Sequence, residues 1–123
     1  MILGIGTDIV ETERIRKAIE KPALKEKVFS VREMEYCDKD ISGQSYAARA
    51  AGKEAFFKAL GTGWRDKMNI YEVEIVNDEL GKPVIELSGE TLKVFERRGG
   101  GKIHISLSHI KETALAFVII EGK

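Results

Sequence analysis

The chain has 123 residues, of which 43% are hydrophobic and 33% are charged. This composition predicts one compact globular domain over residues 1–123 and excludes a disordered chain. Lysine and arginine number 20 and are balanced by 20 acidic residues, which argues against a nucleic-acid binder because phosphate neutralisation requires a clustered basic excess. No apolar run approaches the roughly 20 residues of a membrane-spanning helix. The single cysteine, Cys37, cannot form an internal disulfide, and no leader is recognisable after Met1, so we expect a reducing cytoplasm.

The first half of the chain predicts one strand followed by helices. Residues 1–10 are rich in Ile and Val and indicate a strand, after which helical spacing begins at Glu11 and is expected to stop near Pro22. Ser30 and Glu33 form a capping-box pattern for a helix that ends at Cys37, and residues 38–43 are polar and loop-like. An alanine-rich helix is expected over residues 45–60, with Gly61 as its left-handed cap.

The second half predicts two hairpins separated by a helix. The expected elements are strands over 71–76 and 84–87 joined by a turn at 77–81, a helix from Ser88 to Arg98, a glycine break at 99–101, and strands over 102–109 and 113–120. Hairpins mixed with unevenly spaced helices favour an α+β domain, in which a mainly antiparallel sheet packs against the long central helix. A core this small leaves little room for a ligand pocket, so we expect a second subunit to contribute pocket walls.

The first strand carries an acidic residue among glycines. Its alternation separates two sets of residues: Leu3, Ile5 and Ile9 on one face, and Gly4, Gly6 and Asp8 on the other. We expect the apolar set to face the core and the glycine set to admit a ligand or another backbone. Asp8 could then meet a hard cation. The alternative is that Asp8 is a solvated cap of the following helix.

The long helix places an acid and a base on one face. Glu54 and Lys58 lie one turn apart beside small alanines, whereas Phe56 and Phe57 lie on another face. An ordinary surface pair at this spacing contributes about 0.2 to 0.5 kcal/mol. If the helix instead packs against the glycine face of the first strand, Asp8 and Glu54 can share one Mg²⁺, and Lys58 can contact a phosphate.

Two other motifs do not indicate a catalytic site. Residues 99–102 read Gly-Gly-Gly-Lys, but a helix precedes them and a strand follows, so they predict a connector rather than a P-loop. His104 and His109 lack the spacing of a zinc site, and structural histidines are the default reading. Strand alternation separates His109 from Ser106 and Ser108, which excludes a hydrolase triad.

Residues 12–27 carry a local excess of positive charge. Six basic and three acidic residues there leave an excess of three positive charges: Arg14, Arg16, Lys17, Lys21, Lys25 and Lys27 against Glu13, Glu20 and Glu26. Such a run is either a solvated face or the docking surface for an acidic protein partner.

Three segments together carry a family resemblance. Residues 4–11 (GIGTDIVE), 47–63 (AARAAGKEAFFKALGTG) and 104–109 (HISLSH) resemble bacterial holo-acyl-carrier-protein synthases of the phosphopantetheinyl transferase superfamily. The resemblance extends over the whole length. It implies that phosphopantetheine is transferred from coenzyme A to a serine of apo acyl carrier protein, in support of fatty acid biosynthesis, with Mg²⁺ required and with subunits assembled as a homotrimer.

The resemblance also implies roles for individual residues. Asp8 and Glu54 would ligate Mg²⁺, and Lys58 would complete the catalytic set by contacting the coenzyme A phosphates. The coenzyme A site would be lined by Arg49, Lys58, Gly61, Thr62, Ser108 and His109, and Arg14 would meet the acidic carrier protein. Either Glu54 or a metal-bound water could take the serine proton. Arg49 falls on the Phe56 side of the helix, so its role requires a neighbouring subunit or a frayed helix start.

One helix position departs from the family, and two other functions stay open. Gly52 replaces the family's usual alanine, which costs up to about 1 kcal/mol if the position is exposed. A non-catalytic oligomeric module that binds a nucleotide or an acidic protein is one alternative function. A metal-dependent phosphohydrolase of small nucleotides is the other, because two carboxylates and a lysine suit that chemistry too.

Overall fold

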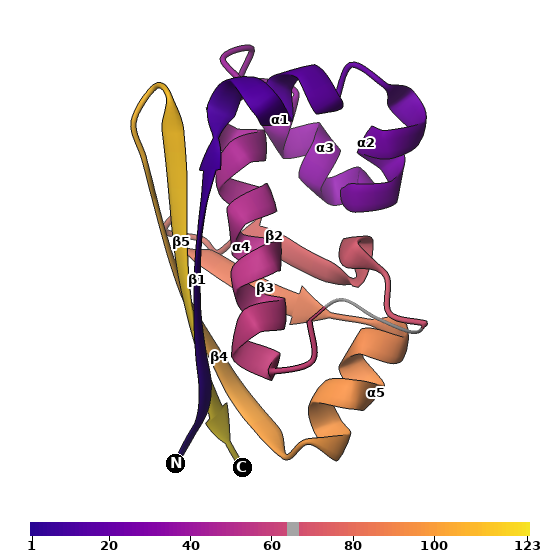
Figure 1. Ribbon diagram of the computed structural model, residues 1–123, viewed down its shortest axis with the longest axis vertical. Helices are drawn as coiled ribbons and strands as arrows, with labels where there is room; N and C mark the ends of the chain where they lie inside the picture. The colour runs from indigo at the N-terminus through magenta and orange to yellow at the C-terminus, as the bar shows by residue number, and fades with distance from the viewer. Residues whose placement is uncertain (64–66) are drawn as a thin grey trace.

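A computed structural model describes residues 1–63 and 67–123 of the chain (Figure 1). In chain order the elements are β1 (Ile2–Glu11), α1 (Thr12–Ala18), α2 (Pro22–Val28), α3 (Val31–Cys37), α4 (Gln44–Leu60), the 3₁₀ turn η1 (Ile70–Glu72), β2 (Val73–Asn77), β3 (Pro83–Leu87), α5 (Gly89–Arg97), β4 (Gly100–His109) and β5 (Thr113–Gly122). No helix in the described part of the chain is long and apolar enough to cross a membrane.

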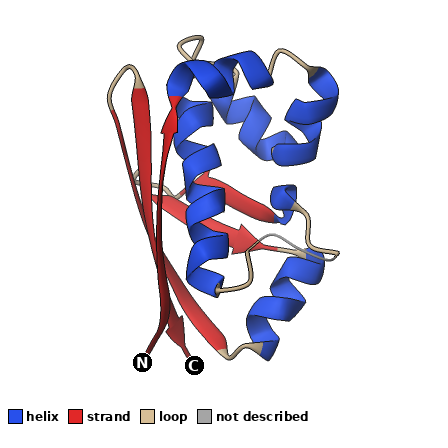
Figure 2. Ribbon diagram, viewed as in Figure 1, coloured by secondary structure: helices blue, strands red, loops and turns tan. Residues whose placement is uncertain are grey.

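The strands form two antiparallel sheets, a three-stranded sheet in the order β1-β5-β4 and the β2–β3 hairpin (Figure 2). Helix α4 packs along one face of the larger sheet, chiefly against β1 and β5. Helices α1, α2 and α3 gather at the N-terminal end of α4, and α5 lies toward the C-terminal end of α4 (Figure 1). The predicted α+β fold with a mainly antiparallel sheet on a central helix is confirmed.

The face of β1 that packs on α4 is the glycine face. A β-carbon on Gly4 would lie 1.9 Å from the carbonyl oxygen of Ala59, and one on Gly6 would lie 2.1 Å from that of Ala55. Only glycine therefore permits this approach between strand and helix backbones. The expectation that the apolar set faces the core is wrong, because Ile5 is 60% exposed and Ile9 is 65% exposed.

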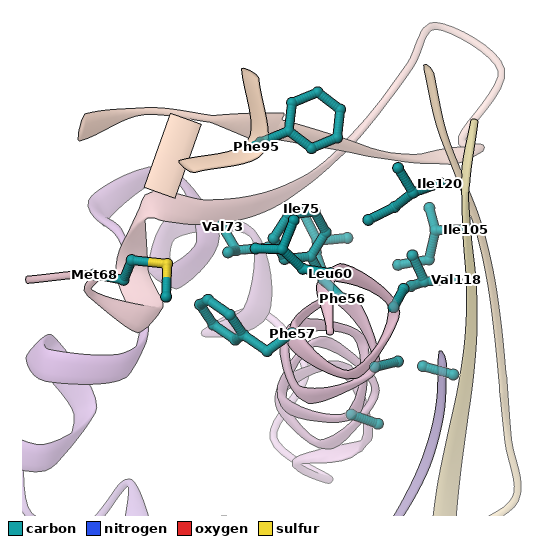
Figure 3. Close-up of a cluster of buried hydrophobic side chains, with 14 residues drawn as sticks. Phe56, Phe57, Leu60, Met68, Val73, Ile75, Phe95, Ile105, Val118 and Ile120 are labelled. Atoms are coloured by element: carbon teal, nitrogen blue, oxygen red, sulfur yellow. The ribbon is translucent and has the colours of Figure 1, made fainter. Parts of the chain in front are cut away.

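The core lies where α4 meets both sheets. Phe56 and Phe57 project from α4 toward Val73 and Ile75 of β2, while side chains of β4 and β5 complete the cluster (Figure 3). Gly52 belongs to this core and is not exposed, since a β-carbon there would lie 2.4 Å from Cδ1 of Ile75. The missing methyl makes room for that isoleucine, so the expected helix-propensity cost is offset by packing.

Several predicted element boundaries need correction. Pro22 does not simply stop a helix, because α1 ends at Ala18 and Pro22 is the first residue of α2, a position where its missing N–H has no intrahelical partner. Residues 70–72 form a 3₁₀ turn, so the strand expected from residue 71 starts at Val73. The glycine break is shorter than expected, since β4 begins at Gly100.

The N-terminus of α5 is held by a carboxylate from a distant part of the chain. Ser88 precedes this helix but makes no side-chain cap. Instead Glu72 accepts hydrogen bonds from the Thr91 amide at 3.2 Å, the Thr91 hydroxyl at 2.7 Å and the Glu90 amide at 3.3 Å. In contrast, the predicted capping box of Ser30 and Glu33 is present at α3.

Candidate active site

Asp8 and Lys58 meet where β1 lies against α4. The Nζ atom of Lys58 donates to Oδ1 of Asp8 at 3.0 Å and to the carbonyl oxygen of Thr7 at 3.0 Å. The Asp8 side chain is largely covered, whereas that of Lys58 is 55% exposed. Asp8 does not cap α1, whose N-cap residue is Glu11. The ion pair therefore joins two elements at a surface that solutes can reach.

Glu54 brings a second carboxylate to the same place. Burial raises the pKa of Glu54, the negative charge of Asp8 raises it further, and Lys58 partly offsets both effects. A bound cation would offset the repulsion between the two negative charges that contributes to the raised pKa of Glu54. No group of three acidic, histidine or cysteine side chains in residues 1–63 and 67–123 is placed to hold a metal. Two carboxylates suit Mg²⁺, which fills its other positions with water and phosphate oxygens.

A cavity of about 470 Å³ opens beside these groups. It is lined by Asp8, Ile9, Val10, Arg14, Ile15, Ala18, Val28, Ala50, Glu54 and Ile70. Its walls are mostly apolar, with the two carboxylates and one guanidinium as its charged groups. Such a pocket suits a ligand that combines an apolar arm with polar groups.

Arg14 is the predicted partner-contact residue that the structure brings to this cavity. It lies on α1, the short helix that follows β1 directly. Two residues on, Arg16 is paired with Glu13 at 2.7 Å, whereas Arg14 has no ion pair among the described residues. The positive charge of Arg14 is therefore open to a ligand or partner.

Arg49 is directed away from the carboxylates. It is 5% exposed, donates to Oδ1 of Asn77 at 3.0 Å and stacks on Tyr36 at 4.4 Å from the ring centroid. Its Nε atom is buried without a hydrogen-bond partner in the described residues. Arg49 therefore lies on the Phe56 side of α4, as expected.

The other predicted coenzyme A residues are dispersed within one chain. Gly61 caps α4 with φ 83°, as predicted, and lies seven residues beyond Glu54 with Thr62 next to it. Ser108 and His109 lie exposed at the end of β4, the far edge strand of the sheet from β1. The four residues therefore lie at two places, Gly61 and Thr62 at the end of α4 and Ser108 and His109 at the end of β4.

Lys53 is a buried residue that the sequence analysis did not single out. Its ammonium is 1% exposed and donates to Oε1 of Glu33 at 2.7 Å and to the carbonyl of Val73 at 2.6 Å. Burial lowers the pKa of Lys53, although the charge of Glu33 opposes that effect. The sequence does contain a signal, because Lys53 begins the i, i+3, i+4, i+7 stripe that continues with apolar residues at 56, 57 and 60.

The outer face of the three-stranded sheet is apolar and exposed on β1 and β5, whereas β4 presents Ser106 and Ser108 there. The register aligns Ile9 of β1 with Leu115 of β5, and Thr7 with Phe117. Leu115 and Phe117 are 43% and 44% exposed, and Ile5 and Ile9 are more exposed still. A contiguous apolar face of this kind on a small domain marks an interaction surface.

Comparison with known proteins identifies the family. Residues 4–118 match the family model described as the 4'-phosphopantetheinyl transferase superfamily. The holo-[acyl-carrier-protein] synthase of Clostridium tetani is 46% identical over 125 residues, which cover 100% of this chain and 98% of that protein. The synthase of Treponema denticola is 45% identical, covering 99% and 100%. The chain belongs to the holo-[acyl-carrier-protein] synthases of this superfamily. It is therefore an enzyme, a phosphopantetheinyl transferase.

Solved structures of holo-[acyl-carrier-protein] synthases share the fold. The enzyme from Neisseria meningitidis superposes with a TM-score of 0.89 at 35% identity, covering 98% of this chain and 99% of that one. The Bacillus anthracis synthase, solved in complex with CoA (3',5'-ADP), gives 0.83 at 33% identity over 100% and 99% of the two chains. The Helicobacter pylori synthase in complex with coenzyme A gives 0.83 at 28% identity over 95% and 99%. The family resemblance inferred from the three sequence segments is confirmed.

Proposed function

We propose that this chain transfers the phosphopantetheine arm of coenzyme A to a serine hydroxyl of an apo acyl carrier protein, with Mg²⁺, as a step that supports fatty acid biosynthesis. Residues 1–123 would act as a single phosphopantetheinyl transferase domain. The observation that carries the proposal is the meeting of Asp8 with Lys58, beside Glu54, at the edge of one cavity. Two carboxylates that can hold a cation and a lysine that can contact a phosphate are groups that phosphoryl transfer uses to stabilise developing charge.

Asp8 and Glu54 are the residues that would hold the divalent cation. Their fit rests on the mutual repulsion that contributes to the raised pKa of Glu54, which a bound cation would remove. When bound, Mg²⁺ would stabilise the negative charge that develops on the departing phosphate.

Lys58 and Glu54 would perform the remaining chemistry. The exposed ammonium of Lys58 is a mobile point charge that can turn from Asp8 to a phosphate oxygen while the Thr7 carbonyl keeps the side chain in place. The carboxylate of Glu54 lines the cavity beside Asp8, so it is our first candidate to accept the serine proton. A water molecule at the cation is the other candidate.

The coenzyme A site would be assembled from two subunits. Arg49, Gly61, Thr62, Ser108 and His109 are the proposed lining residues, and their dispersal within one chain supports a shared site. The apolar outer face of the β1-β5-β4 sheet supports a symmetric assembly, for which a homotrimer is the proposed state.

The acyl carrier protein would dock on the basic helix α1. Arg14 lines the cavity from this helix, so an acidic partner that contacts it would place its serine beside Asp8 and Glu54. Complementary charge of this kind accelerates encounter and depends on ionic strength.

Intact-mass spectrometry of an apo acyl carrier protein tests the function directly. The carrier protein would be incubated with this chain, coenzyme A and Mg²⁺, with an Asp8→Asn variant and an EDTA control in parallel. The expected result is a mass gain of one phosphopantetheine with the natural sequence only. Phosphate release from coenzyme A without any carrier protein would favour a phosphohydrolase instead. No gain with several folded carrier proteins would contradict the proposal.

A further inference from the structure

Lys53 ties three separate elements together inside the protein. Its Nζ atom donates to Glu33 of α3 at 2.7 Å, to the Val73 carbonyl at the start of β2 at 2.6 Å and to the Ile70 carbonyl of η1 at 3.3 Å. Side chains of both partners in the ion pair are almost fully buried. Because desolvating two charges is costly, an apolar pair could fill this space with equal or greater stability. The three directed hydrogen bonds are what an apolar residue could not supply.

Two residues of the cavity wall are attached to this network. Ile70 lines the cavity with its side chain and accepts from Lys53 with its carbonyl. Val28 also lines the cavity, and it is followed by Phe29, whose ring lies 5.5 Å from the Lys53 ammonium, and by Ser30, whose amide donates to Glu33 at 3.0 Å. Ile70 is thus hydrogen-bonded to Lys53 directly, and Val28 is linked to the network through the two residues that follow it in the chain.

Lys53 also precedes Glu54 on α4. Successive helical residues are separated by about 100°, so anchoring the Lys53 side chain on one side of the helix fixes the direction in which Glu54 leaves it. Glu33 strengthens this anchor, because its second oxygen accepts from the Ile75 amide at 2.9 Å. Glu54 and the apolar wall of the cavity are therefore both held in place by Lys53.

We propose that Lys53 is a positioning residue of the active site, whose three hydrogen bonds set the distance between Glu54 and the Val28–Ile70 wall and so govern binding of the divalent cation and of the coenzyme A arm. The inference rests on the function proposed above. Lys53 is itself buried and does not reach the cavity, so its effect is transmitted through Glu33, Ile70 and the helix backbone.

Variants at Lys53 separate positioning from stability. Lys53→Met removes the hydrogen bonds and leaves Glu33 charged and buried, whereas Lys53→Met combined with Glu33→Gln also removes that charge and keeps an acceptor for the Ile75 amide. Phe95→Leu is the control for stability alone, because Phe95 is buried in the core on α5 and does not line the cavity. Thermal unfolding, Mn²⁺ affinity by electron paramagnetic resonance, steady-state transfer kinetics and hydrogen exchange of residues 68–76 would be measured for each.

The positioning role predicts a specific pattern. Both Lys53 variants should bind Mn²⁺ about tenfold more weakly, should show a raised KM for coenzyme A, and should exchange the amides of residues 70–75 faster. The double variant should recover most of the lost thermal stability without recovering Mn²⁺ affinity. Phe95→Leu should lower thermal stability while Mn²⁺ affinity and KM stay unchanged.

Other outcomes overturn the inference or the function separately. Unchanged Mn²⁺ affinity and KM in either folded Lys53 variant would contradict the positioning role without affecting the proposed transferase function. Failure of both variants to fold would also overturn it, in favour of a purely structural role. If the natural sequence binds Mn²⁺ and Lys53→Met weakens that binding, but no carrier protein is modified, the proposed function fails and the positioning role survives.

Discussion

Lys58 and Asp8 form an ion pair across two elements, with 3.0 Å between Nζ and Oδ1. The carboxylate that is proposed to hold a cation is thus already neutralised by a residue of the same site. A divalent ion must compete with Lys58 for Asp8, and binding of that ion would free the ammonium for a phosphate. If the proposed cation binds there, the pair would couple its binding to release of the Lys58 ammonium for a phosphate.

Replacement of Lys58 by methionine tests this coupling. Removing the competing charge should strengthen Mn²⁺ binding several-fold, while transfer to the carrier protein should fall by about 10²- to 10³-fold because the phosphate loses its point charge. Titration by electron paramagnetic resonance and transfer assays would measure the two effects. Lys93→Met on α5 is the control, with no change expected. Weaker Mn²⁺ binding in Lys58→Met would contradict the competition.

Replacement of Gly6 by alanine tests the contact between β1 and α4. The new β-carbon would lie 2.1 Å from the Ala55 carbonyl, so the helix must move away from the strand that carries Asp8. Overpacking of this kind costs about 1 to 3 kcal/mol of unfolding free energy, and Mn²⁺ affinity should fall as Asp8 and Glu54 separate. Gly122→Ala is the control, because its β-carbon would make only an ordinary 3.4 Å contact. Equal effects of the two substitutions in chemical denaturation and Mn²⁺ titration would rule out this geometry.

The β1–α4 contact also shows what the sequence could and could not predict. The long helix with Gly61 as its cap and the capping box at Ser30 follow from local patterns. The packing of α4 on the glycine face is only one of the two readings that the sequence allows, and the structure decides for it. The inward direction assigned to Ile5 and Ile9 was wrong, because alternation identifies two faces but does not say whether α4 or another chain covers the apolar one. Strand patterning alone cannot say which of the two faces packs against a helix and which stays exposed.

Long-range polar contacts were the other features missing from the sequence analysis. Glu72 caps α5 across 19 residues to Thr91, and Lys53 meets Glu33 across 20 residues. Neither pairing has a local spacing rule, unlike the i, i+3 box of Ser30. Nevertheless, the position of Lys53 at the start of an apolar helical stripe indicates that an acidic residue elsewhere in the chain pairs with it.

Charge reversal at Arg14 tests carrier-protein docking. Arg14→Glu should raise KM for the acyl carrier protein by about tenfold, equivalent to roughly 1.4 kcal/mol of binding free energy, and should weaken the salt dependence of the rate. The value of kcat should change little, because Arg14 does not contact the reacting groups. Arg16→Glu is a control from the same helix, since Arg16 is already paired with Glu13. Equal changes in KM for the two variants would point to net charge rather than a specific contact.

A charge on the outer sheet face tests the assembly. Phe117 is 44% exposed in the middle of the apolar face, so Phe117→Lys should dissociate a homotrimer into monomers and abolish transfer, if coenzyme A is held between subunits. Light scattering coupled to size-exclusion chromatography would give the mass. Leu80→Lys changes a 95% exposed side chain in the β2–β3 turn and serves as the control. A monomeric natural sequence that remains fully active would contradict the shared site.

Acid titration of stability tests the cap that Glu72 provides for α5. Burial alone would raise the pKa of Glu72, but hydrogen bonds from Asn69, Thr91 and Glu90 outweigh burial and hold the pKa below its ordinary value. As pH falls, Glu72 is therefore protonated in the unfolded chain before it is protonated in the folded chain. Its stabilising effect is complete above the ordinary glutamate pKa and is lost as pH drops through the lowered pKa of the folded state. Glu72→Gln should cost about 1 to 3 kcal/mol of unfolding free energy at pH 7. In urea unfolding measured at a series of pH values, the difference in unfolding free energy between variant and natural sequence should shrink steadily below pH 5. A constant difference down to pH 3 would show that the charge of Glu72 does not act as the cap.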